Sequence, residues 1–242
     1  MDSDSRSSEL EKCPSNPGRI VTTLPDFDPQ VEQSMVFGHL PIVFDKRVLR
    51  PRPWTVAQSR WAAELLQAMP GPSVALELCS GAGHIGLLAL AMADALPLRL
   101  VTVDVNPAAC ELARRNAEAA GLGERVDVRE GRIDAVLAPE ERFDLVIADP
   151  PWVTSSMTDR FPDDPLIAID GGSDGLDMVR SCLDACDRHL MPGGAVVLQL
   201  GSPGQALRVQ DHVRATESRL SAREIRPFGV HGVLMRLSAG AG

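Results

Sequence analysis

The sequence predicts an α/β fold in which a doubly wound, mostly parallel sheet carries helices on both faces. From about residue 55 onward, short apolar runs alternate with longer amphipathic segments, which is the pattern of strands connected by helices. The turns between them are short and rich in Gly and Pro. The last two strand-like runs, 219–225 and 233–237, have no helix between them, so one of them must run antiparallel to the rest.

Local signals define each element in chain order. Residues 36–49 are β-branched and aromatic and are broken at Pro41, which predicts a short hairpin or two extended pieces. Thr55 is a good N-cap for a helix over 56–69, where Trp61 lies on an apolar stripe and is therefore predicted to be core. We expect further strands at 74–78, 99–103, 125–129, 143–148, 195–200, 219–225 and 233–237, and further helices at 84–95, 107–120, 132–137, 175–190 and 206–215.

Composition divides the chain into three parts. Residues 1–18 are polar and rich in Ser and Pro, which predicts a disordered tail, and residues 19–54 form an N-terminal arm. Residues 55–242 then carry the α/β domain.

Charge and residue usage exclude several classes of function. The net charge of −9 argues against broad binding to a nucleic-acid backbone, which needs a basic face. No apolar run approaches the roughly 20 residues of a membrane span, and the N-terminus lacks the regions of a signal peptide, so we expect a cytoplasmic protein without a membrane partner. The five cysteines fit a reducing compartment, and without His or Cys partners at ligand spacing we expect no metal site.

The stretch ELCSGAGHIG, residues 77–86, follows the first core strand and opens a helix. It contains GxGxxG at Gly81, Gly83 and Gly86, and Asp104 ends the next strand about 20 residues later, as in a nucleotide site. Glycines let the backbone approach a ligand closely, and Asp104 can accept both hydroxyls of a ribose. Glu77 decides the ligand type, because a carboxylate there repels a pyrophosphate and suits an ammonium or sulfonium ligand. This argues against a nicotinamide oxidoreductase.

A second motif, FDLVIADPPW at residues 143–152, ends a buried strand with a carboxylate, two prolines and an aromatic ring. Proline removes backbone donors and stiffens the loop, which leaves carbonyl oxygens free at the edge of the sheet. Asp149 and the Pro150 carbonyl can hold a planar NH2 group, and Trp152 offers a flat face beside it. The motif therefore predicts a site that holds a planar nitrogen next to a cation.

These motifs resemble those of a known family. E-L-C-S-G-A-G with Asp104 is similar to motifs I and II of class I S-adenosylmethionine-dependent methyltransferases, and DPPW is similar to the (Asn/Asp/Ser)-Pro-Pro-(Tyr/Phe/Trp) motif of amino-methyltransferases. VLRPRPWT and AIDGGSDGLD look like stretches of the HemK/PrmC group in particular. The resemblance implies a Rossmann-like sheet of seven strands in the order 3-2-1-4-5-7-6 with the last strand antiparallel, preceded here by a short β-arm.

The resemblance also assigns residues to roles. The cofactor is S-adenosylmethionine and its product is S-adenosylhomocysteine. The catalytic motif is Asp149, Pro150, Pro151 and Trp152. The cofactor is expected to contact Thr55, Glu77, Cys79, Ser80, Gly81, Ala82, Gly83, Asp104, Val105, Asn106, Arg132, Ile133 and Asp149.

Several positions depart from the HemK/PrmC pattern. A short arm replaces that group's N-terminal helical domain, Trp54 stands where an acid is usual, and Asp149 replaces the usual Asn. Arg132 stands where an acidic residue often contacts the adenine amino group. Arg52 and Trp54 lie where the arm could close over the site. These departures bear on the acceptor rather than on the reaction type.

The leading interpretation is an N-methyltransferase that acts on an amide, guanidino or amino nitrogen of a small molecule or a protein side chain. One alternative keeps the fold and makes the acceptor a base in nucleic acid, which the charge disfavours. Another is a nucleotide-binding module without turnover, against which the intact DPPW argues. The sequence leaves the acceptor molecule and the oligomeric state open.

Overall fold

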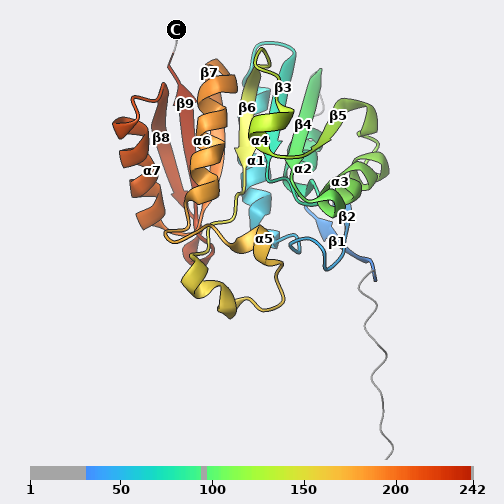
Figure 1. Cartoon of the computed structure of the whole chain (residues 1–242). Helices are drawn as coiled ribbons and strands as arrows, with labels where there is room; N and C mark the ends of the chain where they lie inside the picture. Colours follow the sequence, from blue (N-terminus) through green and yellow to red (C-terminus); the bar gives the residue numbers. More distant parts are fainter. Residues whose placement is uncertain (1–30, 94–96, 241–242) are drawn as a thin grey trace, which may run out of the picture.

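A computed structural model describes residues 31–93 and 97–240. The predicted disordered tail, 1–18, and the first part of the predicted arm lie outside these residues. The centre of the fold is a seven-stranded sheet in the order β5-β4-β3-β6-β7-β9-β8 (Figure 1). Its strands are β3 (Ser73–Leu78), β4 (Leu98–Asp104), β5 (Val126–Glu130), β6 (Phe143–Ala148), β7 (Leu190–Leu200), β8 (Leu220–Pro227) and β9 (Val233–Ala239).

The pairing confirms the predicted topology. Strands β5, β4, β3, β6 and β7 pair in parallel, whereas β9 runs antiparallel to both β7 and β8. Counted along the core domain, the order is 3-2-1-4-5-7-6, as expected for the Rossmann-like sheet of class I methyltransferases.

Helices cover both faces of the sheet. The first face packs against α1 (Val56–Gln67), α2 (His84–Met92) and α3 (Pro107–Ala119), and the second against α4 (Ile133–Val136), α6 (Asp177–His189) and α7 (Pro203–Ala215). Between β6 and α6 the chain makes a long crossover with η3 (Ser155–Arg160) and α5 (Leu166–Ile169), which lies at the edge of the sheet below the strand ends (Figure 1). Shorter 3-10 turns are η1 (Pro53–Thr55), η2 (Gly123–Arg125) and η4 (Gly229–His231).

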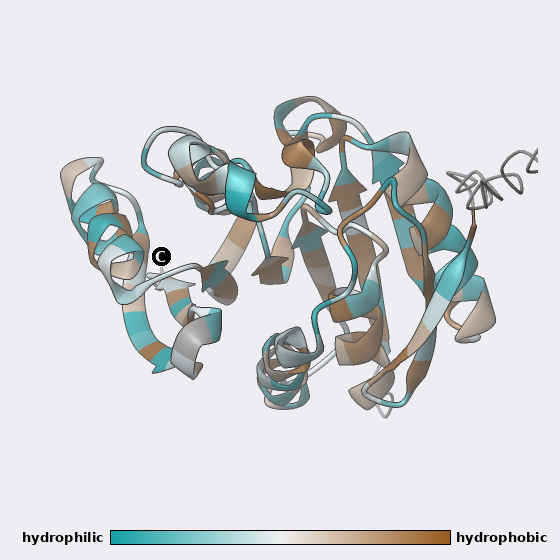
Figure 2. Ribbon diagram, turned by 90° about the horizontal axis from the view of Figure 1, so that it is seen from below, coloured by the Kyte–Doolittle hydropathy of each residue, from teal (hydrophilic) through white to brown (hydrophobic). Residues whose placement is uncertain are grey.

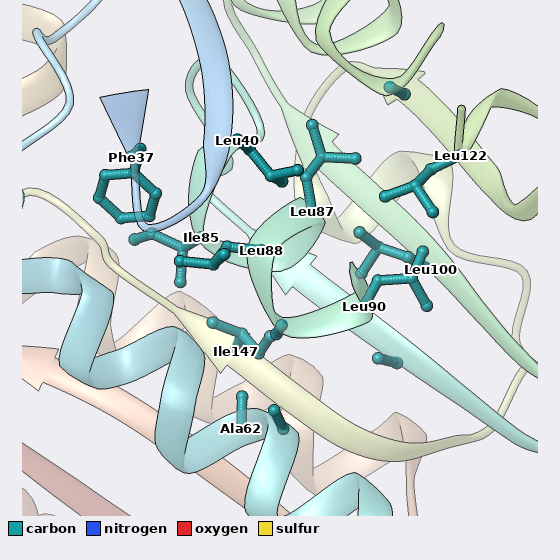
Figure 3. Close-up of a cluster of buried hydrophobic side chains, with 14 of the residues drawn as sticks. Phe37, Leu40, Ala62, Ile85, Leu87, Leu88, Leu90, Leu100, Leu122 and Ile147 are labelled. Carbon is teal, nitrogen blue, oxygen red and sulfur yellow. The ribbon is translucent and has the colours of Figure 1, made fainter. Parts of the chain in front are cut away.

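Alternation along each strand divides the core into two layers. Leu145 and Ile147 of β6 belong to the layer under α1 and α2, whereas Val146 and Ala148 belong to the layer under α6. Figure 3 shows Ile147 within the first of these layers. The hydropathy colouring shows the strands in the middle of the sheet as largely apolar (Figure 2). Trp61 is 2% exposed, which confirms its predicted place in the core. Because successive side chains point to opposite faces of the sheet, the position of a residue along its strand determines which face its side chain lies on. The same alternation applies to the residues just beyond the end of a strand.

The arm is a hairpin of β1 (Gln33–Phe37) and β2 (Leu40–Phe44). It is fastened to the domain by Asn116 of α3, whose Oδ1 accepts the Val43 N–H at 2.8 Å and whose Nδ2 donates to the Val43 carbonyl at 2.9 Å. The same Nδ2 donates to the Ala82 carbonyl in the glycine loop, also at 2.9 Å. One buried amide thus joins the arm, α3 and the loop after β3.

Two local predictions differ from the structure. Thr55 precedes α1, but its hydroxyl donates to the Arg52 carbonyl at 2.8 Å and does not cap the helix. Strand β7 begins at Leu190 rather than at residue 195, because Leu190 pairs with Phe143 and the register shifts between Phe143 and Leu145. Residues 191–194, which the sequence left between the helix expected at 175–190 and the strand expected at 195–200, therefore belong to the strand. The end of the helix predicted over 84–95 lies partly outside the described residues.

Over the described ranges, no helix combines the length and the apolar character needed to cross a membrane.

Candidate active site

Two adjoining cavities lie at the edge of the sheet where the parallel strands end. The larger has a volume of about 320 Å³ and lies over β3, β4 and the turn after β5. The smaller, of about 200 Å³, lies between the DPPW loop, the segment before α1 and the crossover segment. Asp149 lines both cavities. Parallel strands deliver their carboxyl ends to one edge, which is why motifs far apart in the sequence meet here.

The glycine loop and Asp104 form the floor of the larger cavity. Gly81 has φ +53°, and a Cβ placed on it would meet no atom within 4 Å, so this stretch of backbone faces open space. Asp104 accepts the Gly81 N–H at 2.8 Å through Oδ2 and the Asn106 N–H at 2.9 Å through Oδ1. Burial raises the pKa of Asp104, and these backbone donors oppose that rise. The carboxylate is thus fixed in place with lone pairs left for a ligand.

The walls of the larger cavity are mostly apolar. Val105 and Ile133 line it from two sides. Arg132 lies at the rim, where its guanidinium pairs with Asp134 at 3.0 Å, so its charge is balanced. Cys79 also lines the cavity, and the neighbouring Cys182 thiol together with burial holds the pKa of Cys79 well above its ordinary value. A flat, uncharged group fits between the apolar walls.

The predicted cofactor residues fall into three groups. Those that line the larger cavity are Cys79, Gly81, Asp104, Val105, Asn106, Arg132, Ile133 and Asp149. Thr55 lines the smaller cavity instead. Glu77, Ser80, Ala82 and Gly83 line neither cavity, although the last three belong to the glycine loop itself.

Glu77 supports the loop from below. It is 2% exposed, and its Oε1 accepts the Gly86 N–H near the start of α2 at 2.9 Å. Burial raises the pKa of Glu77 to about 8, and the charges of Asp149 and Asp104 act in the same direction. A Cβ on Gly86 would lie 2.4 Å from the Glu77 Oε2, so residue 86 must be glycine for the carboxyl to fit. Its predicted contact with a cofactor stays a prediction.

The catalytic motif is held at the shared wall of the two cavities. Pro151 lines the larger cavity, and Pro150 and Trp152 line the smaller. Burial raises the pKa of Asp149 to about 7. Just before it, the Gln58 side chain of α1 donates to the Ala148 carbonyl at 2.9 Å and to the Val197 carbonyl at 3.1 Å. Gln58 therefore ties the ends of β6 and β7 together beside the carboxyl group.

Trp152 is anchored from the other side by α7 and the turn before it. Gln205 donates to the Trp152 carbonyl at 2.8 Å and accepts the Gly201 N–H, also at 2.8 Å. The indole ring packs on Gly201, where an added Cβ would come within 2.3 Å of the ring. These contacts give the loop one orientation.

The arm and the crossover segment roof the smaller cavity. Arg52 forms an ion pair with Asp164 of the crossover segment. Trp54 stacks on His231 of η4 with ring centroids 4.3 Å apart and an interplanar angle of 11°. Phe161 lines the same cavity. Arg52 and Trp54 thus lie over the site, in agreement with their sequence position.

Three glutamines were missed from the sequence: Gln58, Gln199 and Gln205. Gln199 is 3% exposed and lines the smaller cavity. Glutamine is frequent at exposed positions, so nothing in the local pattern marks a buried, clamping amide. Only the arrangement of the sheet brings these side chains to the site.

The larger cavity fits a nucleoside-bearing sulfonium compound. Its carboxylate at the end of β4 suits ribose hydroxyls, its apolar walls suit a base, and the open backbone at Gly81 admits a chain that leads toward Asp149. The placement of an acidic carboxyl at the inner end suits a cation.

Comparisons with known proteins agree with this geometry. A family model described as a methyltransferase domain matches residues 75–161. A ribosomal protein uL3 glutamine methyltransferase of Bradyrhizobium diazoefficiens is 34% identical over 174 residues, which are 67% of this chain and 53% of the relative. A release factor glutamine methyltransferase of Gloeobacter violaceus is 38% identical over 159 residues, 63% of this chain and 54% of the relative. The chain spans about half the length of the curated relatives it matches.

Solved structures support the fold. The catalytic domain of hMettl16 in complex with a MAT2A 3′UTR hairpin aligns with a TM-score of 0.66 at 14% identity, over 84% of this chain and 76% of that one. A ribosomal protein L11 methylase from Lactobacillus delbrueckii subsp. bulgaricus aligns with a TM-score of 0.61 at 14% identity, over 85% and 97%. The N-terminal domain of human METTL16 in complex with SAH aligns at 0.57 and 15%, over 81% and 73%.

Proposed function

We propose that this chain, a class I methyltransferase by fold and HemK/PrmC-like by sequence, methylates a planar side-chain nitrogen of a protein with S-adenosylmethionine. The observation that carries the proposal is the position of Asp149 on the wall shared by the two cavities. The larger cavity is the methyl-donor site and the smaller is the acceptor site.

Bound S-adenosylmethionine supplies an electrophilic methyl group on a sulfonium sulfur. The residues of this chain position the two partners and shape the nucleophile. Asp104 and the backbone at Gly81 hold the donor, with Val105 and Ile133 beside its base. Asp149 and the Pro150 carbonyl accept the two hydrogens of the acceptor NH2 group. A planar nitrogen has its lone pair delocalised, and these two hydrogen bonds turn that lone pair toward the methyl carbon.

The charge on Asp149 acts chiefly as the reaction proceeds. Positive charge develops on the acceptor nitrogen while the methyl group is transferred, and a carboxylate beside it stabilises that charge more in the transition state than in the ground state. Trp152, held by Gln205, packs along the planar group. The curated relatives act on glutamine side chains of ribosomal protein uL3 and of release factors, which supports a protein acceptor here.

The first test is ligand binding. S-adenosylhomocysteine should raise the Tm of the protein, whereas NAD(P) should leave it unchanged, because the acidic Asp149 at the inner end of the cavity disfavours a pyrophosphate. Stabilisation by NAD(P) alone would overturn the assignment.

The second test identifies the acceptor. Labelled S-adenosylmethionine is incubated with the protein and with separated protein, RNA, DNA and small-metabolite fractions of a bacterial extract. We expect label in the protein fraction. Label confined to RNA or DNA would replace the proposed acceptor with a nucleobase, and no label in any fraction would favour a binding module without turnover.

A further inference from the structure

The crossover segment between β6 and α6 exposes large apolar side chains next to the acceptor cavity. Phe161 is 39% exposed, Leu166 is 58% exposed and Ile167 is 60% exposed. Figure 1 shows this segment at the edge of the sheet where the parallel strands end. Exposed apolar residues that lie together, rather than singly, mark interaction sites. The packing of this chain alone therefore gives no reason for these three residues to be apolar.

The two ends of the crossover segment are fastened to each other, which gives these side chains a fixed platform. Val153, directly after the DPPW motif, forms a parallel β-bridge with Asp170. The Val153 N–H donates to the Ile169 carbonyl at 3.0 Å, and the Val153 carbonyl accepts the Gly171 N–H at 2.8 Å. The Ser155 hydroxyl donates to Oδ1 of Asp170 at 2.7 Å. The exposed residues thus lie on a loop whose base is pinned beside the catalytic motif.

The cavities account differently for the three exposed side chains. Ile167 lines the larger cavity, so a bound methyl donor would cover it. Phe161 lines the smaller cavity and is also exposed, which places it at the mouth of the acceptor site. Leu166 lines neither cavity, yet in the chain it lies between Asp164, which lines the smaller cavity, and Ile167. Leu166 is therefore the exposed residue that neither the donor nor the acceptor group would cover.

The occupant that fits this position is the chain that carries the acceptor group. A side chain that enters the smaller cavity brings its own backbone to the mouth, where Phe161 lies. An extended chain advances about 3.3 Å per residue, so the neighbours of the acceptor residue reach over the rim toward Leu166.

Other occupants fit this surface less well. Residues 155–169 contain three Asp and one Arg, a composition that does not attract the phosphate backbone of a nucleic acid. A surface for a second copy of this chain has no reason to adjoin the acceptor cavity.

We propose that Phe161 and Leu166 form a docking surface for the protein segment that carries the acceptor residue, and that this surface binds an apolar side chain close to the acceptor residue in sequence. The inference rests on the proposed function and adds a sequence preference to it. Covering the two side chains removes apolar surface from water, which favours binding without contact to the reacting atoms. The docking surface should therefore lower KM and leave kcat unchanged.

The test is a leucine scan of a glutamine peptide, because the curated relatives act on glutamine. The host peptide is Gly-Ser-Gly-Gln-Gly-Ser-Gly with blocked ends, and each variant peptide carries leucine at one position beside the glutamine. Binding is measured by calorimetry on the full chain with S-adenosylhomocysteine present, and transfer from S-adenosylmethionine is measured separately. We expect at least one leucine peptide to bind about 5-fold or more tightly than the host, as partial burial of a leucine side chain predicts.

Variants of the chain locate the surface. Leu166→Ser should remove most of the gain of the preferred leucine peptide, with the affinity for S-adenosylhomocysteine within about 2-fold, because Leu166 does not line the donor cavity. Phe161→Leu keeps an apolar side chain at the mouth and should retain the gain, whereas Phe161→Ser should reduce it. Leu207→Ser is the matched control, since Leu207 of α7 is also 58% exposed and lies outside both cavities.

The outcomes separate this inference from the proposed function. Equal affinity of the host and all leucine peptides, no binding of any peptide, or a gain that survives Leu166→Ser overturns the docking surface and leaves the proposed function intact. If Leu166→Ser instead changes the oligomeric state in sedimentation and keeps the gain, the residue belongs to an interface between copies, which also overturns the inference. Failure of the chain to bind S-adenosylhomocysteine would contradict the proposed function itself.

Discussion

The two cavities of the site are built in different ways. The larger takes the residues that we expect to hold the donor from two consecutive strand ends, at Gly81 and Asp104, and from the turn after β5, although residues as distant as Val48 and Arg188 also line it. The smaller takes its residues from segments far apart in the sequence, such as Arg52, Asp164 and Gln199. The difference means that the donor site depends on local motifs, whereas the acceptor site depends on how distant segments pack.

The sharpest test of that division is Asp149→Ala. Because Asp149 lies on the shared wall, its loss should lower kcat on the order of 10³-fold while S-adenosylhomocysteine affinity stays within a few-fold. Steady-state transfer assays and calorimetry on the same preparation check both values. Asp163→Ala, an exposed acid of the crossover segment, is the control. Retained turnover in the Asp149 variant would remove this residue from the chemistry.

Asp104→Ala should produce the opposite pattern. Its carboxylate lines the larger cavity and is oriented by Gly81 and Asn106, and hydrogen bonds to a charged group contribute about 1.5–3 kcal/mol. We expect S-adenosylhomocysteine affinity to fall about 10- to 100-fold in calorimetry, with little change in the affinity for the acceptor. An equal fall in both would mean that the two cavities do not act separately.

The pH dependence of methyl transfer should report the ionisation of Asp149, which lies on the wall shared by the two cavities. Burial raises the pKa of Asp149 to about 7, and only the ionised carboxylate can accept both an N–H bond and a proton. We therefore expect kcat/KM, which reports the free enzyme, to rise with pH through about 7 and to fall about 10-fold for each pH unit below it. Asp149→Asn should remove this dependence. An unchanged profile in that variant would assign the ionisation to another group.

The smallest expected effect concerns the support of the donor loop. The pKa of Glu77 is about 8 in the folded protein, well above that of a free glutamic acid, so its stabilising contribution is complete below about pH 4.5 and is lost as pH rises through 8. Glu77→Gln mimics the neutral form. Its Tm should exceed that of the parent by a margin that grows between pH 5 and pH 8, reaching about 2 °C or more.

Scanning calorimetry between pH 5 and pH 8 measures this difference in Tm between Glu77→Gln and the parent protein. Glu64→Gln, at an exposed position, is the control. A margin that is constant with pH would mean that Glu77 is already ionised in the folded state.

The sequence was informative where chemistry and local geometry coincide. Gly81 could be predicted because a loop that approaches a ligand needs glycine, and Asp149 because a buried strand that ends in an acid and two prolines has few structural reasons to do so. The pattern also predicted β6 as a buried strand, and the structure divides its apolar residues between the two faces of the sheet.

The acceptor side was beyond sequence reasoning for a physical reason. The stacking of Trp54 on His231 joins residues 177 positions apart, and only the packing of η4 against the segment before α1 creates it. The clamp of Gln58 across two strand carbonyls has the same origin. Such contacts depend on the tertiary arrangement, so neither the periodicity nor the composition of the sequence predicts them.

The buried amide of Asn116 gives the arm a part in ligand affinity. Since its one NH2 group serves both the Val43 carbonyl of the arm and the Ala82 carbonyl of the glycine loop, the free energy of docking the hairpin and that of ordering the loop are coupled. Thermodynamic coupling is reciprocal: a ligand that orders the loop must also tighten the arm by the same amount. The backbone amides of β1 and β2 should therefore exchange with deuterium more slowly when S-adenosylhomocysteine is bound, and an arm loosened from α3 should release that ligand faster.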